Sequence, residues 1–150
     1  MDAVRIVNAT RLDPRFPLSR REMSALCAIL LDALGLSGRT FALTLADDRD
    51  IAAVNAEFLG RTGPTNVLSF PAGDGGAGPA SDEEGGDLGE LVLSVDTLAR
   101  ETALYGQEPV AHLARLLAHG ILHLAGHDHG AAMFDLTDAA VDRAVLETAA

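Results

Sequence analysis

Two histidines, His119 and His123, stand four residues apart near the end of a mostly apolar segment. On an α-helix this spacing places both imidazoles on one face, about one turn apart. Two neutral imidazole nitrogens placed in this way can reach one zinc ion at roughly 2.0–2.1 Å each. Gly126 is expected to end the helix, so that the chain can turn back and bring His129 to the same ion. The pattern predicts one zinc ion held by His119, His123 and His129.

The absence of a cysteine from this histidine cluster favours a catalytic zinc over a structural one. Structural sites are closed by four ligands, commonly cysteines, whereas three histidines leave a position open for water. The only cysteine, Cys27, lies far away in an apolar run. His127 or Asp128 is the alternative fourth ligand, and Asp128 is also placed to orient a ligand histidine. His112, about two turns earlier on the same face, is expected to line the cleft or to hydrogen-bond locally.

The residue after the first histidine separates this pattern from a zinc peptidase. The spacing His-x3-His-x2-Gly-x2-His is the ligand arrangement of metzincin proteases, which place their general-base glutamate directly after the first histidine. Position 120 is a glycine here. A peptidase mechanism driven by a carboxylate is therefore disfavoured.

Apolar patterning and turn signals predict the elements that must position these residues. Strands are expected at 4–8, 40–46, 67–70 and 88–94, and helices at 19–34, 48–58, 95–105, 109–125 and 132–147. Their partly alternating order indicates an α/β or α+β fold with a small mixed four-stranded sheet, about five helices and a zinc site at a helix C-terminus. Residues 1–150 are expected to form a single metal-dependent hydrolase domain, with a flexible, acidic, glycine-rich loop at about 72–87.

The net charge of −11 counts against nucleic acid as a ligand, because such binding usually draws on basic groups that neutralise phosphates. It does not exclude RNA, since a bound dication and local arginines can dominate one cleft. The N-terminus has no signal pattern, and no apolar run is long enough to span a bilayer. A soluble cytoplasmic protein without a membrane partner is expected.

Three segments together resemble the YbeY family of bacterial rRNA maturation factors: HGILHLAGHDH at 119–129, PTNVLSFP at 64–71, and Gly89 followed by SVDT at 94–97. Their order and spacing match over roughly residues 40–147. The resemblance implies a single-strand-specific, metal-dependent endoribonuclease acting in 16S rRNA 3′-end maturation and small-subunit quality control. It also implies zinc on His119, His123 and His129, and contact with the small ribosomal subunit and a ribosome-assembly GTPase.

One residue departs from the family pattern. Many relatives carry an arginine directly after the aromatic residue that precedes the PT turn, whereas Phe58 is followed here by Leu59. Arg61 comes two residues later. It either reaches the cleft from the loop, as a catalytic residue that stabilises transition-state charge, or is a solvated loop residue.

The expected reaction is hydrolysis of a phosphodiester that zinc polarises as a Lewis acid. Thr65, Asn66 and Ser69 either hydrogen-bond a phosphate or ribose along the strand edge or serve only the turn and the sheet. No residue stands out as general base, which leaves zinc-activated water or the 2′-hydroxyl of the RNA. Two alternatives stay open: a zinc hydrolase of another phosphoester or amide, and a zinc-stabilised ribosome-assembly factor that binds without strong nuclease activity.

Overall fold

Nine helices and strands appear in the computed structural model, which describes residues 4–8, 18–72, 86–126 and 131–148. They are, in chain order, β1 (Val4–Asn8), α1 (Arg20–Ala33), β2 (Thr40–Ala46), α2 (Asp48–Leu59), β3 (Val67–Pro71), β4 (Asp87–Ser94), α3 (Val95–Tyr105), α4 (Pro109–Leu124) and α5 (Ala131–Thr148). The order and type of every element confirm the sequence prediction. Most of the predicted flexible loop, 73–85, lies outside the described residues.

Local capping signals set several of these boundaries. Ser19 and Glu22 form a capping box at the start of α1, in which each side chain accepts a hydrogen bond from the backbone N–H of the other. Asp47 caps α2 by accepting a 2.8 Å hydrogen bond from Asp50 N. Gly60 ends α2 with a φ of 64°, a conformation that glycine adopts without steric cost. These short-range interactions explain why the sequence locates the helices well.

The four strands form one mixed sheet in the order β1-β2-β4-β3. The first three are parallel neighbours, while β3 runs antiparallel to β4 at one edge. The sequence predicts that Pro71 stops β3, but Pro71 is the last residue of the strand. An edge position allows this, because the proline nitrogen can face away from the neighbouring strand.

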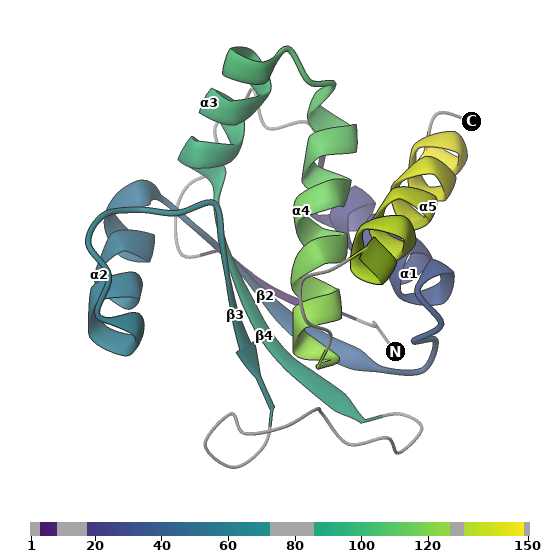
Figure 1. Ribbon diagram of the computed structural model, residues 1–150, viewed down its shortest axis with the longest axis horizontal. Coiled ribbons are helices and arrows are strands. Elements are labelled where there is room, and N and C mark those ends of the chain that lie inside the picture. The colour runs from purple at the N-terminus through teal and green to yellow at the C-terminus, as the bar shows by residue number, and fades with distance from the viewer. Residues whose placement is uncertain (1–3, 9–17, 73–85, 127–130, 149–150) are drawn as a thin grey trace.

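Helices cover the two faces of the sheet unequally. On one face α1, α3, α4 and α5 contribute to the main core, and Figure 1 shows α4 crossing in front of the sheet beside α5. The opposite face carries a smaller core of Ala46, Ile51, Leu68 and Val92, to which α2 contributes Ile51. The sheet therefore separates α2 from α4.

The central helix, α4, is buried almost all round. Its buried residues lie on most sides of the helix and are His112, Leu113, Ala114, Leu116, Leu117, Ala118, Gly120, Ile121, Leu122 and Leu124. The buried surface is this wide because α4 packs on the sheet on one side and on α1 and α5 on others. Residues 111, 115, 119 and 123 form the narrow accessible strip. Neither α4 nor another described helix is long and apolar enough to cross a membrane.

Candidate active site

The two predicted ligands on α4, His119 and His123, lie together on its accessible strip. Their Nε2 atoms are 3.2 Å apart, their ring centroids 4.7 Å apart, and their ring planes are inclined by 79°. Both side chains are partly exposed. The i, i+4 spacing thus makes the two ring nitrogens converge on one point beside the helix.

This convergence fits a zinc ion. Two nitrogens bound to a tetrahedral zinc at 2.0–2.1 Å would be separated by about 3.3 Å. The observed 3.2 Å matches that separation without any movement of the helix. The third predicted ligand, His129, and its neighbours His127 and Asp128 lie outside the described residues. In the part of the chain that the structure describes, no third His, Cys, Asp or Glu joins the pair.

His112, on the same face of α4 as His119, belongs to a different cluster. Its Nε2 lies 3.0 Å from Oε1 of Glu101 on α3, and the His112 and Glu101 side chains are only 10% and 19% exposed. Asn66 Nδ2 donates to both carboxylate oxygens of Glu101, at 3.2 and 3.3 Å. The carboxylate therefore links the residue before β3 to the helix that carries the histidine pair.

Asn66 has further structural contacts. Its Oδ1 accepts a 2.7 Å hydrogen bond from Val67 N, and its backbone oxygen accepts one of 2.9 Å from Ser94 N. The sequence left two roles open for Asn66: binding a phosphate or ribose, or holding the turn and the sheet. The contacts that the structure shows are of the second kind. Glu101 was missed in the sequence because an acidic residue inside an exposed-looking helix gives no signal of a partner 35 residues away.

The other predicted substrate-lining residues lie near the β3 edge. Thr65 is half-buried in the loop before the strand, and Ser69 is half-buried in the middle of it. Ser69 is in register with Leu91 of β4, so both side chains project from the face of the sheet that α4 covers. Leu91 in turn contacts α4: a Cβ added to Gly120 would lie 2.9 Å from Leu91 Cδ2. Ser69 thus stands level with the start of the histidine pair.

Arg61 lies in the exposed loop between α2 and β3. A buried asparagine that the sequence did not reveal organises this loop: Asn55 O accepts from Arg61 N at 3.3 Å, and Asn55 Nδ2 donates to Gly63 O at 3.0 Å. Among the described residues the Arg61 guanidinium has no ion-pair partner. Phe58, 63% exposed, meets Phe70 edge to face at 5.7 Å on the α2 side of the sheet. The structure does not bring Arg61 into contact with His119 or His123.

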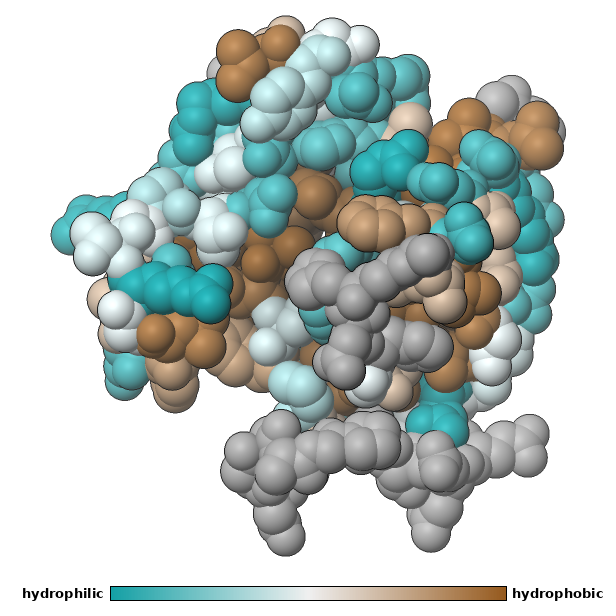
Figure 2. Space-filling model, viewed as in Figure 1, coloured by the Kyte–Doolittle hydropathy of each residue, from teal (hydrophilic) through white to brown (hydrophobic). Residues whose placement is uncertain are grey.

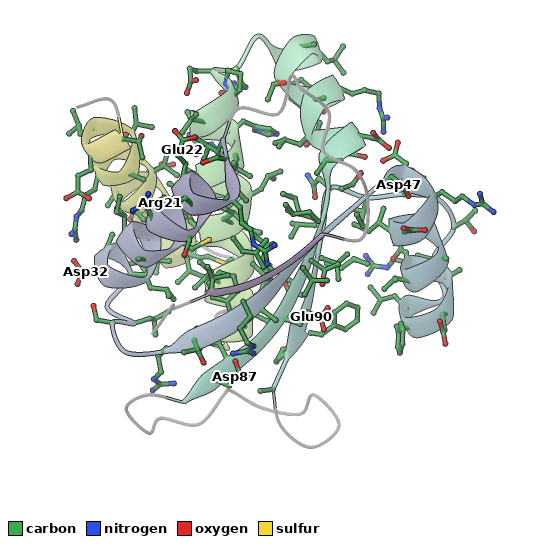
Figure 3. The ribbon with its side chains drawn as sticks, turned by 180° about the vertical axis from the view of Figure 1, so that it is seen from behind. Arg21, Glu22, Asp32, Asp47, Asp87 and Glu90 are labelled. Atoms are coloured by element: carbon green, nitrogen blue, oxygen red, sulfur yellow. The ribbon has the colours of Figure 1, made fainter. Side chains whose placement is uncertain are left out.

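Two elements next to the histidine pair carry no acidic residue. Neither α4 nor β3 contains an Asp or a Glu. Figure 3 shows Asp32, Asp47, Asp87 and Glu90 on or next to α1, α2 and β4 instead. On the opposite side of the molecule, viewed as in Figure 1, Figure 2 shows apolar surface near the middle, between α2 and α5. Carboxylates do lie beside α4, because α5 packs against it and carries Asp135, Asp138 and Asp142.

Comparison with known proteins identifies the family. A family model described as Endoribonuclease YbeY matches residues 17–142. A protein named Endoribonuclease YbeY from Oleidesulfovibrio alaskensis is 44% identical over 149 residues, covering 90% of this chain and 88% of that protein. One of the same name from Nitratidesulfovibrio vulgaris is 48% identical over 142 residues, covering 87% and 88%.

A solved structure supports the fold. The solution structure of TM1509 from Thermotoga maritima matches with a TM-score of 0.68, covering 97% of this chain and 91% of that one. At 22% identity this likeness concerns the fold alone. The family model and the two relatives, which span most of the chain, carry the assignment: the chain belongs to the endoribonuclease YbeY family.

Proposed function

We propose that this protein is a zinc-dependent endoribonuclease that cuts single-stranded RNA. The observation that carries the proposal is the convergence of His119 and His123 Nε2 to 3.2 Å on a helix without acidic residues. The names of the relatives support RNA as the substrate. His129 is proposed as the third ligand of a single zinc ion, and Asp128 as a residue that orients a ligand histidine.

Zinc bound by these histidines would supply Lewis-acid chemistry to a phosphodiester. The protein itself supplies position and charge. The accessible strip of α4 carries His119 and His123, with Arg115 one turn before His119. Arg115 is already paired with Asp138 on α5 at 2.8 Å, so the phosphate is proposed to be held at the two histidines and their zinc. Arg61 is proposed to stabilise the negative charge that develops in the transition state, entering the cleft from its exposed loop.

No described carboxylate is free to act as general base beside the pair. Two described carboxylates contact side chains of α4, and both are engaged: Glu101 accepts from Asn66 and His112, and Asp138 accepts from Arg115 at 2.8 Å. Zinc peptidases use a glutamate to deprotonate the attacking group. We propose that no glutamate does so here. The 2′-hydroxyl of the RNA and a water molecule are the two candidates for that group.

The biological role proposed is 16S rRNA 3′-end maturation and quality control of the small ribosomal subunit, in the cytoplasm. The family membership supports it, together with the match of all three family segments in the sequence. The small subunit and a ribosome-assembly GTPase are the proposed partners.

The test is cleavage of single-stranded rRNA fragments by purified protein, with zinc, with a chelator, and with zinc restored. Cutting is expected to stop with the chelator and to return with zinc. His119→Ala is expected to lose both bound zinc and cutting. His112→Gln is the matched control, because His112 lies on the same helix but outside the pair. This variant is expected to bind zinc like wild type.

Three results would change the assignment. Stoichiometric zinc without RNA cleavage would favour the ribosome-assembly factor, and the replacement of the usual arginine by Leu59 would be its explanation. Cleavage of a peptide but not of RNA would replace the nuclease by another zinc hydrolase. Cleavage that survives the chelator and the His119→Ala substitution would remove zinc from the mechanism.

A further inference from the structure

The outer edge of β3 has an unusual set of hydrogen-bonding groups. The backbone hydrogen bonds Ser94 N to Asn66 O, 2.9 Å, and Ala72 N to Leu88 O, 3.0 Å, bracket the strand. In an antiparallel pair, residues alternate between those whose backbone groups face the partner and those whose groups face away. Residues 66, 68, 70 and 72 therefore face β4, and Val67, Ser69 and Pro71 direct their backbone groups outward.

Two of the three outward donors are missing from this edge. Val67 N–H already donates to Asn66 Oδ1 at 2.7 Å. Pro71 has no N–H. Ser69 N–H is the remaining donor, while the carbonyl oxygens of all three residues point outward. Among the described strands nothing pairs with this side of β3, which ends the sheet.

This pattern is a poor match for another extended polypeptide. A peptide or a second copy of the chain that added as a strand would need alternating donors and acceptors along the edge. A capped donor and a proline are devices that prevent such pairing. The edge instead offers three carbonyl acceptors. They lie two residues apart along the strand, which is a spacing of about 6.7 Å. It calls for a ligand that presents repeated hydroxyl or amine donors.

We propose that the outer edge of β3 binds single-stranded RNA by accepting hydrogen bonds from ribose 2′-hydroxyls at the carbonyls of Val67, Ser69 and Pro71. The 2′-hydroxyl is the donor that distinguishes RNA from DNA. The inference rests on the proposed function and deepens it, by assigning the choice of RNA to a strand edge instead of to a side chain.

The position of the edge agrees with this role. Ser69 is in register with Leu91, and Leu91 packs against α4 at Gly120, the residue after His119. The strand contains no acidic residue that would repel the RNA backbone. A strand of RNA along β3 would therefore pass level with the histidine pair.

Binding of three oligonucleotides of one sequence, measured by fluorescence anisotropy with zinc-loaded protein, tests the proposal. They are single-stranded RNA, the DNA equivalent, and RNA whose 2′-hydroxyls are methylated. All three carry the same phosphates, and only the first carries 2′-hydroxyl donors. RNA is expected to bind about tenfold tighter than the other two, the effect of one or two neutral hydrogen bonds. The titration is repeated with a chelator, under which RNA is not expected to be cut.

Carbonyl ¹³C chemical shifts of labelled protein locate the contact. Each outward carbonyl is read through the amide of the following residue, Leu68, Phe70 or Ala72, which faces β4. RNA is expected to move these three shifts, and the DNA and methylated RNA to leave them nearly unchanged. Equal affinity for RNA and DNA, failure to bind RNA, or shifts confined to another surface would overturn the proposal.

Cleavage assays on the same samples separate this inference from the proposed function. RNA that binds through its 2′-hydroxyls without being cut would support the edge and remove the nuclease. If the protein cuts RNA but binds RNA and DNA with equal affinity, the nuclease function would stand and the role of the strand edge would fall.

Discussion

Asp48, the first residue of α2, accepts a 2.6 Å hydrogen bond from the hydroxyl of Ser94, the N-cap of α3. The same oxygen accepts from Thr97 Oγ1 at 2.6 Å, and the other carboxylate oxygen lies 2.6 Å from Arg100. Asp48 N donates in turn to Asp96 at 3.0 Å. One carboxylate therefore joins the N-terminal turns of two helices at the end of β4.

The substitution Asp48→Asn is expected to destabilise the protein at pH 7 by about 2 kcal/mol, the usual value of hydrogen bonds to a charged group. Burial opposes ionisation of Asp48, but hydrogen bonds from Arg100, Ser94 and Thr97 outweigh it and hold the pKa below its ordinary value of 3.8. Stability from this carboxylate is thus present above pH 3.8 and is lost as the pH falls through the lowered value.

Urea unfolding at pH 7 and near pH 3 measures this effect. The difference between wild type and Asp48→Asn is expected to shrink at the lower pH, where the wild-type carboxylate begins to protonate. Asp50→Asn, in the same helical turn but exposed, is the control and is expected to change stability little. A difference independent of pH would contradict the role assigned to the charge.

Glu101 is expected to matter for stability and not for metal binding. Glu101→Ala would leave Asn66 Nδ2 and His112 Nε2 without their acceptor, which is expected to cost about 2–3 kcal/mol. Glu101→Gln keeps an acceptor oxygen and is expected to cost about half as much. Zinc stoichiometry, measured on the same samples, is expected to stay at the wild-type value. Loss of zinc from a variant that unfolds like wild type would show that Glu101 acts on the metal site.

The contact between Gly120 and Leu91 predicts an energetic coupling. In Gly120→Ala the new Cβ would lie 2.9 Å from Leu91 Cδ2 in a fully buried position. Overpacking of about 1–3 kcal/mol is expected to exceed the gain of about 1 kcal/mol in helix propensity. Leu91→Ala alone should cost about 2–5 kcal/mol.

The double variant is expected to lose about 1 kcal/mol less than the sum of the single losses, because the smaller residue at 91 leaves room for the Cβ. Urea unfolding of all four proteins measures the difference. Simple additivity would mean that the two positions do not compete for space. The same contact explains why position 120 is unsuited to the glutamate of a zinc peptidase: that side chain would begin against the core of the sheet.

Features that depend on neighbours in the chain were predictable, and features that depend on distant contacts were not. The His119–His123 pair follows from helix geometry, and α1 begins at Ser19 because its capping box lies within four residues. Pro71 was placed outside β3 because a sequence does not reveal which strand forms the sheet edge. Glu101 acts through Asn66, a partner 35 residues away, so its position in the sequence carried no signal. Asn55 donates to Gly63 O, only eight residues on, but nothing in the helical pattern distinguished it from an exposed asparagine.

The thiol of Cys27 is expected to be unreactive in the native protein. Cys27 is fully buried in α1, and this burial raises the pKa of the thiol from 9.0 to about 12. A thiol-specific disulfide reagent at pH 8 is therefore expected to label the protein only after denaturation, since the thiolate is the reactive form. Rapid labelling of native protein would show that α1 opens readily from the sheet.

The same shift predicts a loss of stability in alkali. Above pH 9 the unfolded state releases the thiol proton while the folded state keeps it up to about pH 12. The free energy of unfolding is therefore expected to fall by up to about 1.4 kcal/mol per pH unit in that window. The measurement compares wild type with Cys27→Ala, so that the effect of this thiol is isolated. The variant starts less stable, having lost the buried sulfur, but its stability is expected to decline less steeply, and equal slopes would contradict the buried neutral thiol.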